Sequence, residues 1–306
     1  MYRKILTFVF LLFVITASYA AGDIEGKITV DGIEREYILH LPKDYGSEPL
    51  PLVLVFHGGG GNAGQIKDHV KFNKTADKNN FICVYPNAVD KNWSDGRVGE
   101  KLPEDRDDVK FINTLLDTLI ANYKINKKRI FSTGISNGAF FSIYLAYKMP
   151  ERLLAVAPVC GNIPENIRES FKLSSPVSLL LINGTKDPLV KYDGGAVGFG
   201  DNESKRGTSI STDWTIKIWT ENNSCQQSSK IEEMDDKEDD GCTEEKTTYY
   251  KCADGTKVVL IKIKGGGHTW PGASQYLPKI LVGTVCKDFN ANHVIWEFFS
   301  SLPDKN

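Results

Sequence analysis

The sequence predicts an α/β fold, with a mostly parallel central sheet and helices on both of its faces. Two observations support this prediction: short, continuously apolar runs recur along the chain, and runs with helical spacing separate them. A continuously apolar strand has both faces buried, which is typical of a parallel sheet covered by helices. The composition, with 41% hydrophobic and 25% charged residues among 306, is that of an ordinary globular protein.

Seven apolar runs are expected as strands. They cover residues 37–41, 52–56, 81–85, 129–133, 154–159, 177–182 and 258–263. Helices are expected over 109–123, 139–149, 211–223 and 291–299. In the first and last of these helices, apolar residues recur every three or four positions. The acidic stretch 232–245 is interpreted as a solvated surface loop, because its carboxylates lack the ligand spacing of a calcium loop.

The first twenty residues are typical of a secretory signal peptide. Arg3 and Lys4 precede an apolar run over 5–15, and Ser18 and Ala20 occupy positions −3 and −1 of the expected cut. The run is too short to span a bilayer as a helix. We therefore expect a signal peptide over 1–20 and a single domain over 21–306. The mature protein should be secreted, or periplasmic in a bacterium, with no membrane attachment after cleavage.

The charge balance of the chain indicates which classes of partner to expect. The chain has 37 basic and 39 acidic residues, which gives a net charge of −2. Such a chain has no extended basic field, so nucleic acid is not expected as a partner. We expect the protein to be a monomer.

All six cysteines follow the signal peptide, so an oxidising compartment permits disulfides. Cys225 and Cys252 flank the acidic stretch, and we expect them to pair, because the bond would restrain a segment with few apolar anchors. Cys83 is expected as a buried free thiol, and Cys242 with Cys286 is a second candidate pair. No C-x-x-C motif and no Cys/His cluster is present, so no metal site is expected.

The motif G-x-S-x-G at residues 134–138 lies between an expected strand and an expected helix. A serine on such a sharp strand-to-helix turn projects its hydroxyl above the edge of the sheet. This context favours a nucleophile over a simple turn, and it indicates Ser136.

A serine nucleophile requires a base, and an acid that orients the base. Of the five histidines, only His268 and His293 follow Ser136. His268 lies in a glycine-rich loop after the last strand, whereas His293 lies in the expected C-terminal helix, so His268 is the expected base. Asp187 is the first carboxylate after the strand 177–182 and is the expected acid. On spacing alone, Asp193 and Asp213 remain alternatives.

A glycine run at residues 58–61 follows His57 at the end of an expected strand. In α/β hydrolases this position supplies one amide of the oxyanion hole, and the residue after the nucleophile supplies the other. Gly59, with Gly60 as the alternative, and Asn137 are therefore expected to form it. The run lacks the lysine of a P-loop, which excludes that phosphate-binding motif. His57 is expected to brace the loop and not to act as the base.

Taken together, these motifs resemble the secreted esterases of carbohydrate esterase family 1, which include feruloyl esterases and polyhydroxybutyrate depolymerases. The blocks that carry the resemblance are His57–Ala63, Trp93–Arg97, Gly134–Gly138, Asn183–Asp187, Gly266–Gly272 and Asp288–Phe289. The resemblance implies an α/β-hydrolase catalytic domain, with Ser136 as nucleophile, Asp187 as acid and His268 as base. It implies no cofactor. Ala139 departs from the family, which usually has a second glycine there.

The expected function is that of a secreted serine carboxylesterase, with an ester as its substrate. We expect feruloyl or acetyl esters of plant cell-wall xylan, because no further module follows the last helix and because Trp93 and Trp270 are expected to bind the substrate at the site mouth. One alternative is a polyhydroxybutyrate depolymerase, and a peptidase or lipase on the same fold also stays open. An alternative of another class is a catalytically inactive binding protein with a hydrolase fold.

Overall fold

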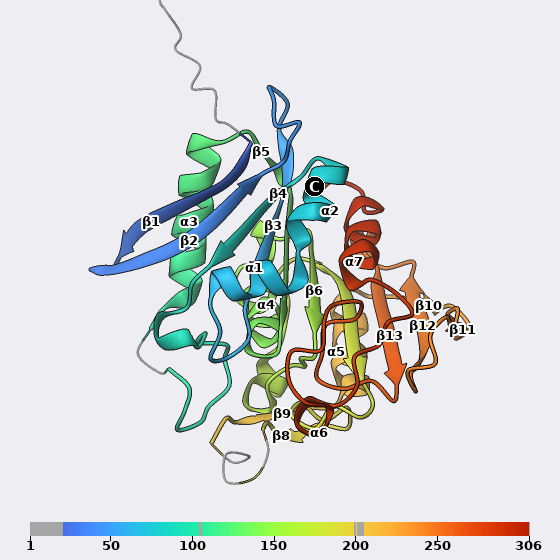
Figure 1. Ribbon diagram of the computed structural model, residues 1–306. Helices are drawn as coiled ribbons and strands as arrows, with labels where there is room; N and C mark the ends of the chain where they lie inside the picture. Colours follow the sequence, from blue (N-terminus) through green and yellow to red (C-terminus); the bar gives the residue numbers. More distant parts are fainter. Residues whose placement is uncertain (1–20, 104–105, 199, 201–204, 306) are drawn as a thin grey trace, which may run out of the picture.

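The computed structural model describes residues 21–103, 106–198, 200 and 205–305, so the expected signal peptide 1–20 lies outside it. Within these residues the chain forms one eleven-stranded sheet (Figure 1). Its strands are β1 (Gly22–Val30), β2 (Ile33–Leu41), β3 (Leu50–Phe56), β4 (Ile82–Pro86), β5 (Ile125–Ile135), β6 (Ala155–Val159), β7 (Ser178–Gly184), β10 (Gln227–Ser228), β11 (Glu232–Glu233), β12 (Thr243–Tyr250) and β13 (Val258–Lys264). None of the described helices is long and apolar enough to cross a bilayer.

The sheet is parallel in its centre and antiparallel at its edges. The strand order is β1-β2-β4-β3-β5-β6-β7-β13-β12-β10, and β11 pairs with β12. The six strands from β4 to β13 in this order run parallel to one another. A separate small ribbon joins β8 (Gly195–Ala196) to β9 (Thr208–Ser209). Parallel strands end at the same edge, so the loops after them meet there.

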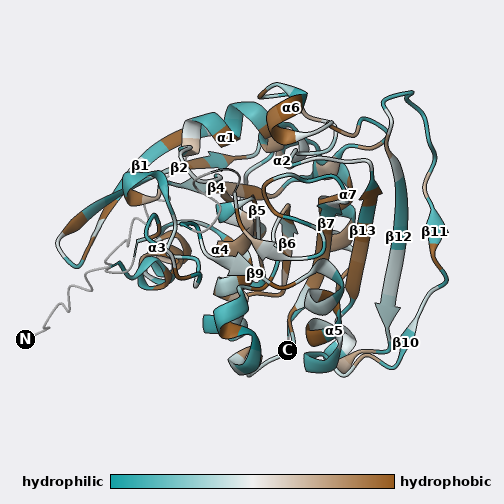
Figure 2. Ribbon diagram, turned by 90° about the horizontal axis from the view of Figure 1, so that it is seen from below, coloured by the Kyte–Doolittle hydropathy of each residue, from teal (hydrophilic) through white to brown (hydrophobic). Residues whose placement is uncertain are grey.

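Helices cover both faces of the sheet (Figure 2). One face carries α1 (Ala63–Val70), α2 (Phe72–Asn79) and α7 (Ala291–Ser300), and the other carries α3 (Asp108–Asn122), α4 (Asn137–Lys148) and α5 (Thr212–Asn222). The side chains of β3 alternate between the two cores: Leu52 and Leu54 pack with α3 and α4, and Val53 and Val55 pack with α1 and α2. This burial on both faces explains why β3 is continuously apolar.

All seven expected strands and all four expected helices are present, with boundaries shifted by a few residues. The interpretation of residues 232–245 as a solvated loop is wrong in part. Glu232–Glu233 forms β11, Thr243 opens β12, and the Glu244 side chain is buried. The sequence did not predict these strands, because β12 begins Thr-Glu-Glu-Lys-Thr-Thr and lacks the apolar pattern of the buried strands.

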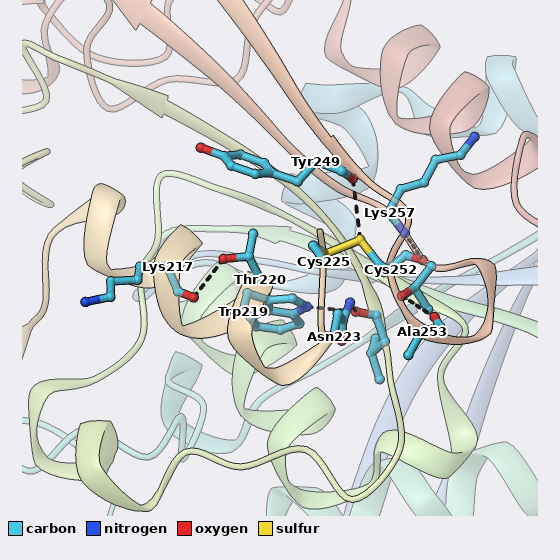
Figure 3. The surroundings of a disulfide bond; sticks show 12 residues. Lys217, Trp219, Thr220, Asn223, Cys225, Tyr249, Cys252, Ala253 and Lys257 are labelled. Atoms are coloured by element: carbon cyan, nitrogen blue, oxygen red, sulfur yellow. Dashed lines mark hydrogen bonds between the residues drawn. A yellow bond between two sulfur atoms is a disulfide. The ribbon is translucent and has the colours of Figure 1, made fainter. Parts of the chain in front are cut away.

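The structure contains the expected disulfide between Cys225 and Cys252 (Figure 3). It ties the chain just after α5 to the turn that follows β12. Nearby, the Trp219 indole donates to the backbone carbonyl of Val177 at 2.7 Å and fixes α5 on the sheet.

The other four cysteines, Cys83, Cys160, Cys242 and Cys286, are free and buried. The prediction for Cys83 is therefore confirmed. The second candidate pair, Cys242 with Cys286, is wrong. The Cys286 thiol instead donates to the carboxylate of Glu244, with an Sγ–Oε1 distance of 2.7 Å.

Candidate active site

Loops after β3, β5, β7 and β13 meet at the carboxyl edge of the sheet. They carry the residues that the sequence singled out, namely the glycine run at 58–61, Ser136, Asp187 and His268. The glycine run, Ser136 and His268 line one cavity of about 590 Å³. Residues far apart in the chain thus lie together because these parallel strands end at the same edge of the sheet.

Ser136 lies on a strained turn between β5 and α4. Its backbone has φ 57° and ψ −122°, which an L residue rarely adopts. The turn survives because Gly138 lets the chains approach closely: a Cβ there would lie 2.5 Å from the carbonyl oxygen of Phe56. The Ser136 amide also donates to Val159 at 3.0 Å, which anchors the turn to β6. Strain of this kind is typical of functional residues.

His268 and Asp187 form a buried pair. His268 Nδ1 lies 2.7 Å from Asp187 Oδ2, and both side chains are almost fully buried. The other carboxylate oxygen, Oδ1, accepts from the amides of Leu189 and Val190, each at 2.8 Å. These three bonds fix the carboxylate and leave His268 Nε2 as the ring nitrogen available to the cavity.

The two alternative acids lie elsewhere. Asp193 is exposed, and Asp213 accepts a hydrogen bond from the Tyr192 hydroxyl at 3.0 Å. Among the described residues the Ser136 hydroxyl has no hydrogen-bond partner. Such bonds between nucleophile and base are often long without substrate and tighten when it binds.

The amides expected for the oxyanion hole differ in availability. The amide of Gly60 donates to Lys91 at 2.8 Å and is therefore committed. Asn137 is the first residue of α4, so its amide has no acceptor within the helix. Within the described part of the chain, the Gly59 amide donates to nothing, and a Cβ on Gly59 would lie 3.6 Å from that of Asn137. The geometry favours Gly59 over Gly60.

His57 is bound on both sides within this loop. Its Nδ1 lies 2.8 Å from the carbonyl of Gly58, and its Nε2 accepts from the amide of Ala88 at 3.1 Å. Burial lowers the pKa of His57 to about 4, so the ring is neutral near pH 7. A neutral imidazole with a hydrogen bond at each ring nitrogen is suited to holding the loop in place.

One buried polar network near the site did not follow from the sequence, although its residues belong to the blocks 93–97 and 134–138. Asp95 forms a salt bridge with Arg97, with an Nη2–Oδ2 distance of 2.6 Å, and both side chains are buried. The Asn137 side-chain amide donates to Asp95 at 2.7 Å and accepts from the Trp93 amide at 2.8 Å. The network thus holds the first residue of α4, whose amide is a candidate oxyanion donor.

The prediction that Trp93 and Trp270 bind substrate is wrong. Trp93 is fully buried and stacks on Phe141 at 4.8 Å, and its indole donates to the carbonyl of His57. Trp270 is also buried, and its indole donates to Asn292 at 2.9 Å. Both rings support loops of the site from behind, and neither lines the cavity. Their positions beside motif residues in the sequence did not show whether the two side chains line the cavity or pack in the core.

Part of the cavity wall comes from segments that the sequence did not single out. Ile66 and His69 belong to α1, and Tyr276 and Leu277 precede the short helix α6 (Lys279–Val282). The rings of His69 and Tyr276 meet edge to face at 5.6 Å. The Tyr276 hydroxyl donates to the carbonyl of His268 at 3.1 Å. Burial lowers the pKa of His69 and raises that of Tyr276, so both rings are uncharged near pH 7.

Two further side chains adjoin the site. Arg206 is exposed at the cavity rim and is the charged member of its lining. Cys160 is buried beneath the pair of Asp187 and His268, and its Sγ lies 3.4 Å from the carbonyl of Thr269. Burial, and then the charge of Asp187, raise the pKa of Cys160 well above its usual range. A neutral thiol in this place fills space beneath the acid.

The chain is similar to known esterases in sequence. Residues 35–193 match the sequence model of the family described as Esterase PHB depolymerase. The chain is 29% identical over 267 residues to NocK, an inferred esterase of Nocardia uniformis subsp. tsuyamanensis, covering 84% of this chain and 77% of NocK. It is 25% identical over 241 residues to feruloyl esterase B of Piromyces equi, covering 76% of this chain but only 42% of that protein.

The fold is similar to that of a solved esterase. The acetyl xylan esterase from Aspergillus awamori superposes with a TM-score of 0.59, and the alignment covers 90% of this chain and 99% of that chain. The two sequences are 14% identical, so the likeness concerns the arrangement of the sheet and its helices.

Proposed function

Since the chain belongs to the esterase PHB depolymerase family and has the α/β-hydrolase fold, we propose that it is a serine carboxylesterase with Ser136 as its nucleophile. The observation that carries this proposal is the arrangement at one cavity. Ser136 and His268 both line it, and Asp187 holds the far nitrogen of the imidazole at 2.7 Å. Nucleophile, base and orienting acid are the parts that ester hydrolysis through an acyl-enzyme requires.

The proposed reaction has two halves. His268 Nε2 takes the proton of the Ser136 hydroxyl as its oxygen attacks the ester carbonyl, and the amides of Gly59 and Asn137 stabilise the oxyanion. The imidazolium, held by Asp187, then protonates the leaving alcohol, and an acyl-enzyme remains. Water, deprotonated by His268, attacks this acyl group, and Ser136 leaves with the proton. The acid and the free enzyme result, and no cofactor takes part.

Turnover of a chromogenic short-chain nitrophenyl ester tests the proposal. The wild-type protein should release nitrophenol with an initial burst, and Ser136→Ala should release it only at the background rate. We expect the variant to fold normally, because Ser136 lies on a loop and not in the core. Circular dichroism checks this. A folded wild-type protein that neither turns over the ester nor shows a burst would support the alternative, an inactive binding protein.

For the substrate we propose an ester of plant cell-wall polysaccharide, with a feruloyl or acetyl group as the acyl part. One relative in sequence is named feruloyl esterase B, and the structural neighbour from A. awamori is named acetyl xylan esterase. The wall formed by Ile66, His69, Tyr276 and Leu277 is uncharged and partly aromatic, which suits a planar aromatic acyl group. The cavity of about 590 Å³ is within the usual range for small-molecule sites.

The second candidate is a polyester depolymerase, which the family description favours. Purified protein should be tested in parallel on methyl ferulate, on feruloylated and acetylated xylan oligomers, and on a polyhydroxybutyrate suspension. We expect release of ferulate or acetate. Clearing of the suspension without any such release would replace the plant-wall substrate with the polyester.

We further propose that the protein is secreted after removal of residues 1–20, and that residues 21–306 form one catalytic domain and act as a monomer. The apolar run with two basic residues before it supports cleavage. N-terminal sequencing of protein recovered outside the cytoplasm tests this, and it should begin at Ala21. Light scattering of the same sample should give the mass of one chain.

A further inference from the structure

Away from the catalytic edge, three buried side chains bring donor atoms together. Glu244 lies on β12, and Cys286 and Asp288 lie on the loop before α7. One donor atom from each lies within 4.8 Å of the other two. The Cys286 Sγ is 2.7 Å from Glu244 Oε1 and 3.9 Å from Asp288 Oδ2. All three residues are at most 4% exposed.

The cluster is incompletely satisfied by the protein. Glu244 is 1% exposed, yet its Oε2 atom has no hydrogen-bond partner. Among the described residues, no basic side chain forms an ion pair with Glu244 or Asp288. A buried carboxylate without a counter-charge is costly, and a bound cation would supply that charge.

We propose that Glu244, Cys286 and Asp288 bind one thiophilic divalent cation, for which Zn²⁺ is the best chemical match. One thiolate with two carboxylates is a donor set for Zn²⁺ or Cd²⁺, whereas Ca²⁺ and Mg²⁺ prefer oxygen alone. In a tetrahedral zinc site such donors lie about 3.4–3.6 Å apart. The distances of 2.7 and 3.9 Å found here reach these values through shifts of under about 1 Å.

The surroundings already hold one of the ligands in place. The other oxygen of Asp288, Oδ1, accepts from the amides of Lys237 and Glu238 at 2.7 Å each, so one oxygen is held and Oδ2 is left for the cation. Cys242 lines an adjoining cavity of about 490 Å³ within the acidic loop. Lys237 and Glu238, whose amides hold Asp288, line the same cavity. The cation would join β12 to the loop before α7, and its binding would displace the Cys286 thiol proton and any proton on Glu244 into water.

Cadmium binding tests the site with a readout that is independent of esterase activity. The Cd²⁺–thiolate charge-transfer band should appear upon titration of metal-free mature protein and saturate at one equivalent. Zn²⁺ should displace the band and Ca²⁺ should not. Cys286→Ser should lose the band, and Glu244→Gln should weaken Cd²⁺ binding at least tenfold, because the amide is a poorer ligand.

Cys160→Ser is the matched control, because Cys160 lies with Asp187 and His268 in the one other cluster of such donors that the described residues contain. This variant should keep the band. Loss of the band in Cys160→Ser with retention in Cys286→Ser would overturn the proposal, as would no band in the wild type. A Cys242–Cys286 disulfide in the isolated protein would also overturn it, because the thiolate ligand would be gone. Circular dichroism confirms that each variant is folded.

Discussion

Each oxygen of Asp187 has a separate partner, and this determines what its substitution should do. One oxygen receives His268 Nδ1–H, and the other receives two backbone amides. In Asp187→Asn an amide NH₂ replaces one of these oxygens. If it faces His268, the imidazole takes the tautomer that cannot accept the Ser136 proton. We expect kcat to fall by about 10⁴, as in serine proteases, with folding intact.

Asp193→Asn and Asp213→Asn are the matched controls, and both should keep wild-type kcat. Steady-state kinetics on a nitrophenyl ester decides between the three carboxylates. Near-normal activity of Asp187→Asn, with a loss in either control, would assign the acid role to that other residue.

The lowered pKa of His57 predicts how the stability of the fold should depend on pH. Its pKa is about 4 in the folded protein, against about 6.5 for a free imidazole. Between these values the unfolded chain binds more protons, so the free energy of unfolding should fall as the pH drops from about 6.5 to about 4. A shift of this size corresponds to a contribution on the order of 3 kcal/mol. His57→Gln cannot titrate and should lack this contribution.

Urea unfolding of wild type and His57→Gln at several pH values isolates the effect, because other groups cancel in the difference. The stability difference between the two proteins should shrink toward acid pH. Parallel curves for both proteins over this range would show that His57 does not titrate in this way.

At the scale of elements, the segment between β4 and α3 contains a buried ion pair, and Asn137 at the start of α4 donates a hydrogen bond to its carboxylate. Asp95 and Arg97 are both nearly fully buried, and the Arg97 guanidinium also lies 4.1 Å over the ring of Phe140. Asp95→Asn would leave Arg97 as a buried charge without its partner. We expect a loss of about 3–5 kcal/mol in the free energy of unfolding, which denaturant titration measures.

Asp117→Asn provides the comparison. Asp117 forms an ion pair with Arg152, and the Asp117 side chain is 65% exposed. Such a pair contributes about 0–1 kcal/mol. Equal effects of the two substitutions would mean that burial of the Asp95 pair carries no energetic consequence.

The disulfide fixes the far edge of the sheet. It closes a segment of 27 residues that includes β10, β11 and β12. By the loop-entropy relation, this closure stabilises the fold by about 3–4 kcal/mol. The double variant Cys225→Ser, Cys252→Ser should lose about that much stability while keeping its esterase activity, because neither residue lines the cavity. Thermal unfolding and nitrophenyl ester turnover measure the two quantities, and a large loss of turnover in folded protein would contradict this separation.

At the scale of the whole molecule, the sequence was most informative where a pattern has one physical cause. The apolar runs become buried strands because a parallel sheet needs them, and the predicted α/β-hydrolase fold and esterase family are confirmed. The glycines around Ser136 mark a turn that no other residue permits. These features are local, so they can be read from a single chain.

The rest depends on distant contacts. Trp93 and Trp270 lie beside motif residues in sequence, but their rings face the core, which no local pattern reveals. Tyr276 reaches the cavity from a segment with no motif, and it meets His69 of α1 only because the chain folds back. The burial of Glu244 could not be predicted from its acidic stretch, because it depends on contact with the loop that carries Cys286.

The most direct test of the central claim, that Ser136 is the nucleophile of an ester hydrolase, is covalent labelling with a fluorophosphonate followed by peptide mass mapping. One adduct per chain should form on the peptide that contains Ser136, with loss of fluoride. Ser136→Ala should remain unlabelled, and His268→Ala should label far more slowly. Folded wild-type protein that stays unlabelled, or that carries its adduct on another residue, would contradict the account.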